Sequence, residues 1–198
     1  MHPNDSHSCT AFDGQRLLAS GSVPEVALAA KAALDAGSAG PVLILDDASS
    51  LPVEVDFRGT PAEMLARLHA ANSIPADTTP RGPGRPKLGV TAREVTLLPR
   101  HWDWLGRQPG GASAALRRLV EDARRSDGNR DRARLADEAT DRFLRVMGGD
   151  LPGYEDATRA FWRGDRQGFA ALIEPWPADL RHHLALLAAI AWDERAAA

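Results

Sequence analysis

The chain has 198 residues, with 24 basic and 27 acidic side chains, one cysteine and a hydrophobic content of 43%. These values exclude wholesale disorder and an intramolecular disulfide, and they allow one large domain or two small ones. No apolar run reaches the roughly 18 residues of a membrane helix, and the polar first ten residues carry no secretory signal. We therefore expect a soluble, cytoplasmic protein.

Charge is distributed unevenly along the chain. Residues 1–78 carry 4 basic and 10 acidic groups, residues 79–125 carry 10 and 4, and residues 126–198 carry 10 and 13. The net charges of these segments are therefore −6, +6 and −3. This asymmetry indicates that the central segment has a role that its flanks lack.

The first segment is typical of a small ββαββα domain that follows a disordered stretch over residues 1–9. Asp13-Gly14 predicts a hairpin turn, Ser22 and Glu25 have the spacing of a capping box, and Thr60 begins a second such box with Glu63. The expected strands cover residues 10–12, 16–19, 42–45 and 51–57, and the expected helices cover residues 24–37 and 61–72.

Residues 73–90 are rich in proline and glycine, so we expect a linker without regular structure. Its second half contains Gly84-Arg-Pro-Lys87, which resembles an AT-hook. The resemblance implies an extended backbone in the minor groove of A·T-rich DNA, with Arg81, Arg85 and Lys87 as DNA contacts. The alternative is a basic linker that rests on the acidic first segment.

The central segment, residues 91–126, has the order strand, short helix, glycine turn, longer helix. The strand is expected at 93–98 and the short helix at 100–108, and Ser113 is expected to cap the longer helix. This order resembles the ribbon-helix-helix fold of the Arc and Met repressor superfamily. The matching stretches are VTLLP, HWDWL, PGG and SAALRRLVEDARR.

The resemblance implies a homodimer whose strands pair from Glu94 to Leu98 and enter the major groove of DNA. One strand parity turns Arg93 toward the bases and the other turns Thr96, and neither supplies the usual two or three polar base readers. The start of the longer helix would clamp a phosphate through its N–H groups. Gly111 and Ser113 lie at this position. Separately, Arg117 is predicted to meet a phosphate, and the alternative is a charged outer face of the helix.

The last segment, residues 127–198, is expected to be helical, with helices near residues 130–147, 154–162, 166–173 and 179–192. The complete sequence also resembles an uncharacterised bacterial family that is known only as a domain of unknown function. The stretches FDGQRLLASG, RGPGRPKLGVTAREVTLLPRHWDWL and DLPGYEDATRAFWRGD carry this resemblance, which implies no established activity.

The polar clusters of the sequence favour structural roles over catalysis. Asp46-Asp47 is typical of a turn, and His182-His183 point about 100° apart on a helix, so they cannot chelate one ion. Cys9 is expected in a mobile terminus, and one of Trp102 and Trp104 is expected in the core. We predict no catalytic residue, no metal site and no cofactor, and therefore no enzyme.

The sequence thus predicts an α+β protein in three parts: the ββαββα domain, the ribbon-helix-helix-like segment and the helical region. Two functional hypotheses follow. The first is a DNA-binding transcriptional regulator that uses the basic linker and the central segment. The second is a dimeric interaction or scaffold protein that does not bind nucleic acid.

Overall fold

The computed structural model describes residues 8–38, 40–72 and 93–198. The chain divides into two compact units. Unit 1 combines residues 1–73 with residues 129–198, and unit 2 comprises residues 74–128. The expected first and third parts therefore fold together, because side chains from both share one core. The described part of unit 2 is residues 93–128.

A three-stranded antiparallel sheet lies at the centre of unit 1. It is formed by β1 (Ser8–Asp13), β2 (Arg16–Ser22) and β3 (Val42–Asp46), in the order β2-β1-β3. The predicted hairpin is present, and its turn is made by Gly14, at φ +57°, and Gln15. β1 begins earlier than expected and includes Cys9, which is fully buried because its side chain packs in the core between the sheet and a helix.

The helices of the first segment begin at the predicted caps. In α1 (Val23–Asp35), the Glu25 carboxylate accepts hydrogen bonds from the backbone N–H and hydroxyl of Ser22. In α2 (Pro61–Asn72), Glu63 accepts from the Thr60 N–H at 2.8 Å, while the Thr60 hydroxyl accepts from the Glu63 N–H at 3.3 Å. These reciprocal bonds satisfy N–H groups that a helix start leaves without partners.

The predicted strand at residues 51–57 is not a strand. Its side chains alternate as expected, since Val53, Val55 and Phe57 pack against the core while Glu54 is exposed. Only one isolated bridge joins this segment to the sheet, between Leu45 and Pro52. Two backbone hydrogen bonds flank this bridge, from the Val53 N–H to the Ile44 carbonyl at 2.8 Å and from the Asp46 N–H to the Leu51 carbonyl at 2.9 Å. The pairing goes no further, and packing of the apolar side chains holds the rest of the segment.

The helices of the last segment follow the predicted positions closely. They are α5 (Gly128–Gly148), α6 (Tyr154–Arg163), α7 (Arg166–Ile173) and α8 (Ala178–Ala197). Asp179 lies in the first turn of α8 and does not cap it, because its carboxylate accepts a hydrogen bond from the Leu17 N–H of β2 at 2.8 Å. This bond links the last helix to the first hairpin.

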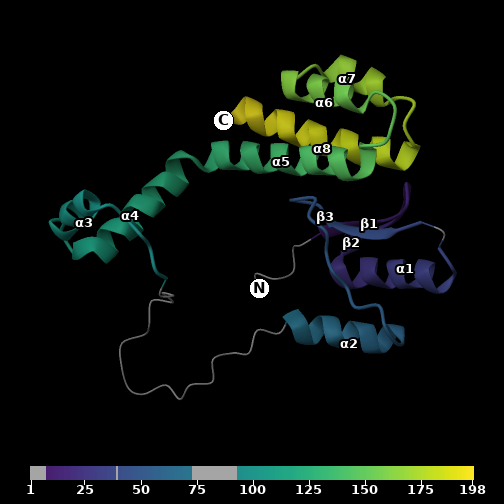
Figure 1. Ribbon diagram of the computed structural model, residues 1–198, viewed down its shortest axis with the longest axis horizontal. Helices are drawn as coiled ribbons and strands as arrows, with labels where there is room; N and C mark the ends of the chain where they lie inside the picture. The colour runs from purple at the N-terminus through teal and green to yellow at the C-terminus, as the bar shows by residue number, and fades with distance from the viewer. Residues whose placement is uncertain (1–7, 39, 73–92) are drawn as a thin grey trace. The chain divides into compact units, whose positions relative to one another are not determined.

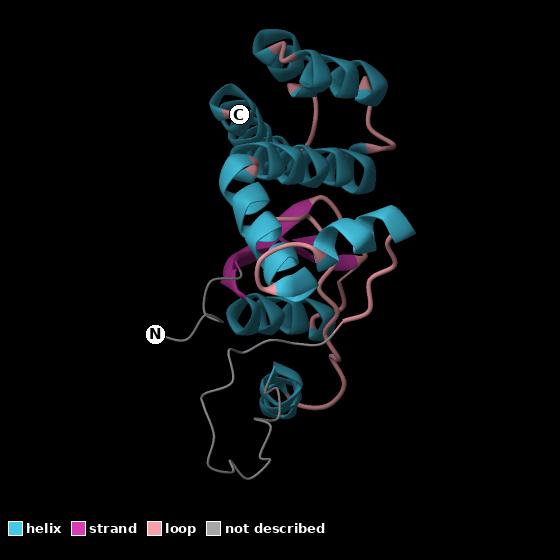
Figure 2. Cartoon of the chain, turned by 90° about the vertical axis from the view of Figure 1, so that its left-hand side faces the viewer, coloured by secondary structure: helices cyan, strands magenta, loops and turns pink. Residues whose placement is uncertain are grey.

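Unit 1 is layered, with the sheet between α1 on one face and the pair α5 and α8 on the other (Figure 1). Figure 2 shows the same order of layers from the side. Phe12 of β1 contacts Phe143 of α5 at a ring-centroid distance of 5.7 Å, which anchors the sheet to the helices. Burial of such aromatic side chains contributes several kcal/mol each, on the order of 3–5 kcal/mol when measured by truncation to alanine.

The described part of unit 2 contains two helices, α3 (Pro99–Gly106) and α4 (Gly111–Ser126), which pack against each other. The strand predicted at residues 93–98 is absent, and these residues have no regular secondary structure. A strand needs a neighbour for its hydrogen bonds, and the described part of this single chain does not supply one. The ribbon-helix-helix arrangement therefore stays a prediction.

No helix in the described ranges is both long enough and apolar enough to cross a membrane.

Candidate nucleic-acid interface

The predicted DNA contacts fall into two groups. Arg81, Arg85 and Lys87 lie outside the described residues, so the hook-like contact stays a prediction. The other group consists of Arg93, Thr96, Gly111, Ser113 and Arg117, all of which are described and belong to unit 2.

In residues 93–98, which precede α3, side chains at both odd and even positions are exposed. Arg93, Glu94 and Thr96 are exposed, Val95 is 53% exposed and Leu97 is half-buried. Neither Val95 nor Leu97 is fully enclosed within the single chain. This exposure is compatible with pairing of residues 94–98 with a second chain.

The start of α4 differs from the prediction. The helix begins at Gly111, and its N-cap is Gly110 in the left-handed conformation with φ +81°, so Ser113 lies in the first turn and is not the cap. A β-carbon at residue 110 would lie 2.9 Å from the β-carbon of Ala114, which makes glycine the residue that fits.

The backbone N–H groups at this helix start are partly available. The Gly111 N–H donates to the Gln108 carbonyl at 2.9 Å, and no side chain caps the helix. The N–H groups of Ala112 and Ser113 have no acceptor within the helix, as in any first turn. These two groups, and not that of Gly111, are the ones that could meet an anion.

Arginines are paired differently in the two units. In the described part of unit 1, ten of thirteen arginines form ion pairs. In residues 93–128, only Arg124 and Arg125 do so, each with an acidic residue three positions earlier. The remaining five are exposed and form no ion pair within the described residues: Arg93, Arg100, Arg107, Arg117 and Arg118.

Comparison with known proteins places the chain in a family. The model of a family described as "Uncharacterized protein conserved in bacteria (DUF2239)" matches residues 8–188. The chain belongs to the DUF2239 family. The matched range runs through both units of this DUF2239 protein, so unit 2 is part of what the family shares. No curated protein and no solved structure gives a significant match.

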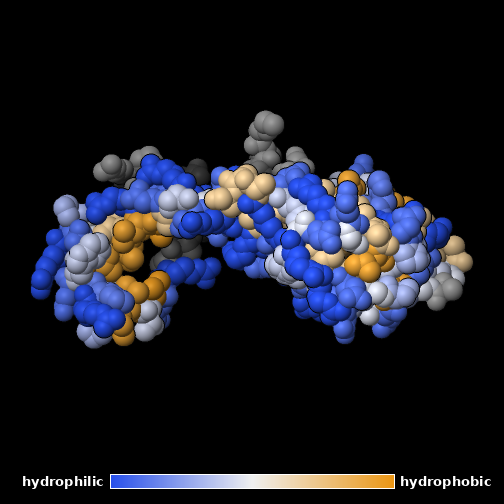
Figure 3. Space-filling model, turned by 90° about the horizontal axis from the view of Figure 1, so that it is seen from above, coloured by the Kyte–Doolittle hydropathy of each residue, from blue (hydrophilic) through white to orange (hydrophobic). Residues whose placement is uncertain are grey.

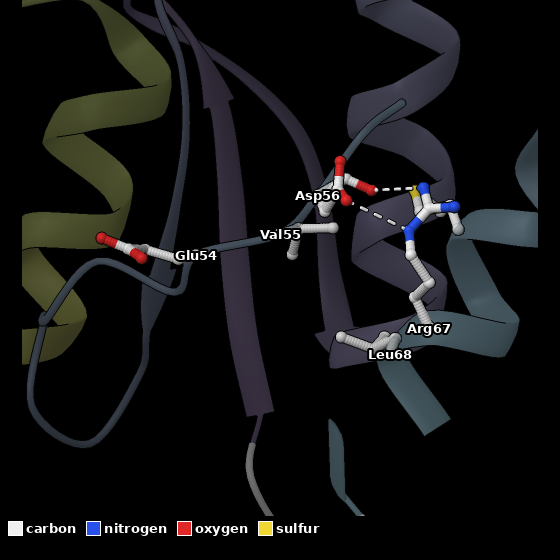
Figure 4. Close-up of a pocket in the computed structure, with 6 residues that line it drawn as sticks. Glu54, Val55, Asp56, Arg67 and Leu68 are labelled. Carbon is white, nitrogen blue, oxygen red and sulfur yellow. Dashed lines mark hydrogen bonds and ion pairs between the residues drawn. The ribbon is translucent and has the colours of Figure 1, made fainter. Parts of the chain in front are cut away.

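A cavity of about 420 Å³ in unit 1 of this DUF2239 protein was not foreseen from the sequence. It lies between residues 54–56 and α2. Its polar wall is the ion pair between the Arg67 guanidinium and the Asp56 carboxylate, at 3.2 Å, while Glu54 points away from both (Figure 4). The hydrogen bonds of Arg58, and its charge together with that of Arg67, hold the pKa of Asp56 well below its usual range. The wall is therefore already neutralised, which leaves little charge to recognise a ligand.

The acidic pair Asp46-Asp47 accepts hydrogen bonds from neighbouring residues of unit 1 in the DUF2239 fold. The Asp46 carboxylate accepts from the Ser49 N–H at 2.9 Å, and Asp47 accepts from the buried Thr10 hydroxyl at 2.7 Å. Within the described ranges, no three His, Cys, Asp or Glu side chains gather as metal ligands would. Burial, with smaller effects of Asp47 and Asp46, raises the pKa of the Cys9 thiol to about 11, so this thiol is a poor nucleophile.

Neither tryptophan of α3 lies in a core, contrary to the prediction for one of them. Trp102 is 43% exposed and Trp104 is 50% exposed. Only Leu105 of this helix is buried, and in the described part of unit 2 the element that packs against α3 is α4. The sequence showed two tryptophans on this helix but not which elements pack against it.

Proposed function

We propose that this DUF2239 protein binds DNA through unit 2, including its basic residues Arg81, Arg85 and Lys87, as a homodimer paired from Glu94 to Leu98. The observation that carries the proposal is the group of five exposed arginines without ion pairs in residues 93–128, because most arginines of unit 1 are paired. Exposed cations attract phosphates, and their binding releases the counterions that are condensed on the DNA.

In this proposal the contacts divide by role. Arg81, Arg85 and Lys87 grip the minor groove or the backbone, and Arg117 meets a phosphate beside the start of α4. Depending on which side of the strand faces the DNA, the side chain closest to the bases is Arg93 or Thr96. With so few polar side chains on residues 93–98, contacts to the backbone contribute more than base readout. We therefore expect a modest sequence preference, and a transcriptional role would depend on it.

Binding of the purified protein to mixed-sequence and A·T-rich duplexes over a salt series tests this function. We expect affinity to fall log-linearly with salt. The triple variant R81A/R85A/K87A should flatten the slope by roughly three, since each lost phosphate contact removes about 0.9. Arg163→Ala, which removes an exposed arginine of α6 that forms no ion pair within the described residues, is the matched control and should change neither slope nor affinity.

Absence of binding at low salt would refute the proposal.

The second candidate, a dimeric interaction protein without nucleic acid, is favoured by one observation. Val95 and Leu98 expose apolar surface in the segment that would face DNA. If the triple variant and the control lower the affinity equally, binding is not specific to unit 2, and the second candidate is preferred.

A further inference from the structure

A second cavity lies within unit 1, and it contains none of the residues assigned to DNA binding. Its volume is about 440 Å³, and its walls come from one side of α5, the last turn of α6 and the end of α8. The helices α5 and α8 run side by side (Figure 1). Cavities that hold small molecules have volumes of about 300–1,000 Å³, so this one is large enough for a small ligand.

Trp162 of α6, in the wall of the cavity, differs from the other two tryptophans of unit 1. The indole N–H groups of Trp176 and Trp192 donate to backbone carbonyls at 2.9 and 3.0 Å. Trp162 is 50% exposed, and its N–H donates to no acceptor within the described residues. Seen from the side of α6 and α7, unit 1 presents mainly hydrophilic residues (Figure 3). Trp162 therefore offers an open aromatic ring and an available donor in a polar setting.

Arg195 of α8 is fixed in the same wall. Its Nε donates to the Asp137 carboxylate at 2.7 Å, its Nη1 donates to the Phe161 carbonyl at 3.2 Å, and its Cζ lies 5.0 Å from the centroid of the Trp162 ring. Its Nη2 is the one buried side-chain nitrogen or oxygen of the described ranges without a hydrogen-bond partner. A buried donor without an acceptor is unfavourable. A rotation of the half-exposed Trp162 side chain would open Nη2 to a ligand oxygen.

The ion pairs of the wall leave positive charge in excess. Besides the pair just described, the wall contains Arg134, which pairs with Glu138 at 2.8 Å and with Asp131, outside the wall, at 3.3 Å. Arg130, about one turn earlier on α5, is exposed and forms no ion pair within the described residues. With three arginines and two acidic residues, the side chains of the wall have a net charge of +1. This balance favours an anion.

We propose that this cavity binds a small organic anion, with a planar apolar body against Trp162 and a carboxylate facing Arg130 and Arg195. A planar ring gains from contact with the indole beyond its burial, and a carboxylate accepts charge-assisted hydrogen bonds from guanidinium groups. The cavity beside Asp56 has neither an aromatic side chain nor an unpaired arginine in its wall. The site shares no residue with unit 2, so its ligand is independent of DNA binding.

Isothermal titration calorimetry of the full chain tests the proposal, with indole-3-acetate as the probe. Two further probes divide its chemistry, since acetate carries the charge without the ring and indole carries the ring without the charge. We expect indole-3-acetate to bind at one site per chain and more tightly than either of the other two.

Variants of the wall locate the site. Arg130→Ala should weaken the binding of indole-3-acetate by about tenfold or more, because it removes a charge-assisted contact. Trp162→Ala should weaken it by up to about tenfold through the lost ring contact. The matched controls are Arg163→Ala and Trp104→Ala, which remove an exposed arginine without an ion pair and a tryptophan of equal exposure, both outside the cavity. Both controls should leave the affinity unchanged, and circular dichroism verifies that each variant keeps its helix content.

No binding of indole-3-acetate at millimolar concentrations would overturn the proposal. Equal affinities for indole and indole-3-acetate would also overturn it, because the arginines would then not recognise the carboxylate. Binding that either Arg130→Ala or Trp162→Ala leaves unchanged would place the ligand elsewhere and overturn it too. Binding that both variants weaken and both controls retain supports the proposal, whether or not the chain binds DNA.

Discussion

The two units of this DUF2239 protein treat their apolar and charged side chains in opposite ways. In unit 1, aromatic residues such as Phe143 and Phe161 are fully buried, and even Arg195 is held by Asp137 at 2.7 Å and lies over the Phe161 ring at 4.7 Å. In unit 2, apolar side chains and unpaired arginines are both exposed. Unit 1 therefore encloses two hydrophobic cores within one chain, whereas residues 93–128 enclose only Leu105 and Ala115.

Truncation of one large apolar residue in each unit should give the largest difference in the free energy of unfolding between the two units. Phe143→Ala should lower the free energy of unfolding by about 3–5 kcal/mol, because it leaves a cavity beside Phe12 and His183. Leu119→Ala should cost no more than about 0.5 kcal/mol in dilute protein, where its side chain is already exposed. Urea unfolding followed by circular dichroism measures both, and equal losses would contradict the contrast.

Substitution of two helix-terminal glycines should give the next largest effect. A β-carbon at Gly148 would lie 2.7 Å from the Trp176 ring, so Gly148→Ala should destabilise unit 1 by about 1–3 kcal/mol through overpacking. Gly128→Ala has nothing within 4 Å and is the matched control, expected to be neutral or slightly stabilising. Thermal unfolding of the two variants compares them, and a harmless Gly148→Ala would show that the Trp176 contact is loose.

Substitution at the start of one helix in each unit should give a smaller difference in stability. Asp165 accepts a hydrogen bond from the Gly168 N–H at 2.9 Å at the start of α7, so Asp165→Ala should cost about 1 kcal/mol. Ser113→Ala should cost almost nothing, since Gly110 and not Ser113 is the N-cap of α4. Chemical denaturation resolves the difference. A larger loss for Ser113→Ala would mean that its hydroxyl does cap α4.

The smallest expected effect is a pH dependence confined to unit 1. Burial between Phe12 and Phe143 lowers the pKa of His183, which outweighs the opposing charge of Asp47, and His182 lowers it slightly further. The unfolded state then binds more protons than the folded state. Stability is therefore full above about pH 6.5 and falls as the pH drops toward the folded pKa. Unfolding at several pH values should show a weaker acid loss for His183→Gln than for the exposed His182→Gln, and identical profiles would contradict this.

Local signals along the chain predicted most elements of unit 1. The capping residues Ser22 and Thr60 fixed the starts of α1 and α2, and α7 matches its predicted span. These features depend on neighbours in sequence, which a single sequence displays. The alternation over residues 51–57 correctly assigned the buried side, but it does not show how far backbone pairing extends, which here is the single bridge between Leu45 and Pro52.

Long-range features could not be read from the pattern. The bond from Leu17 to Asp179 spans 162 positions, and the union of the first and last segments depends on such contacts. In the candidate interface, residue types predicted the exposed Arg93, Thr96 and Arg117, whereas the cap at Gly110 required the backbone conformation. Periodicity shows which side of a helix is apolar but not whether another element packs against that side. The exposure of Trp102 and Val120 therefore could not be predicted.

Hydrogen exchange of the backbone amides as a function of protein concentration tests the central contrast most directly. We predict that protection in α5 and α8 is independent of concentration, because unit 1 is closed within one chain. Protection in α3 and α4 should rise with concentration, because a second copy completes unit 2. Equal and constant protection of α3 and α4 down to the lowest concentration would contradict the account, since it would show that unit 2 needs no partner.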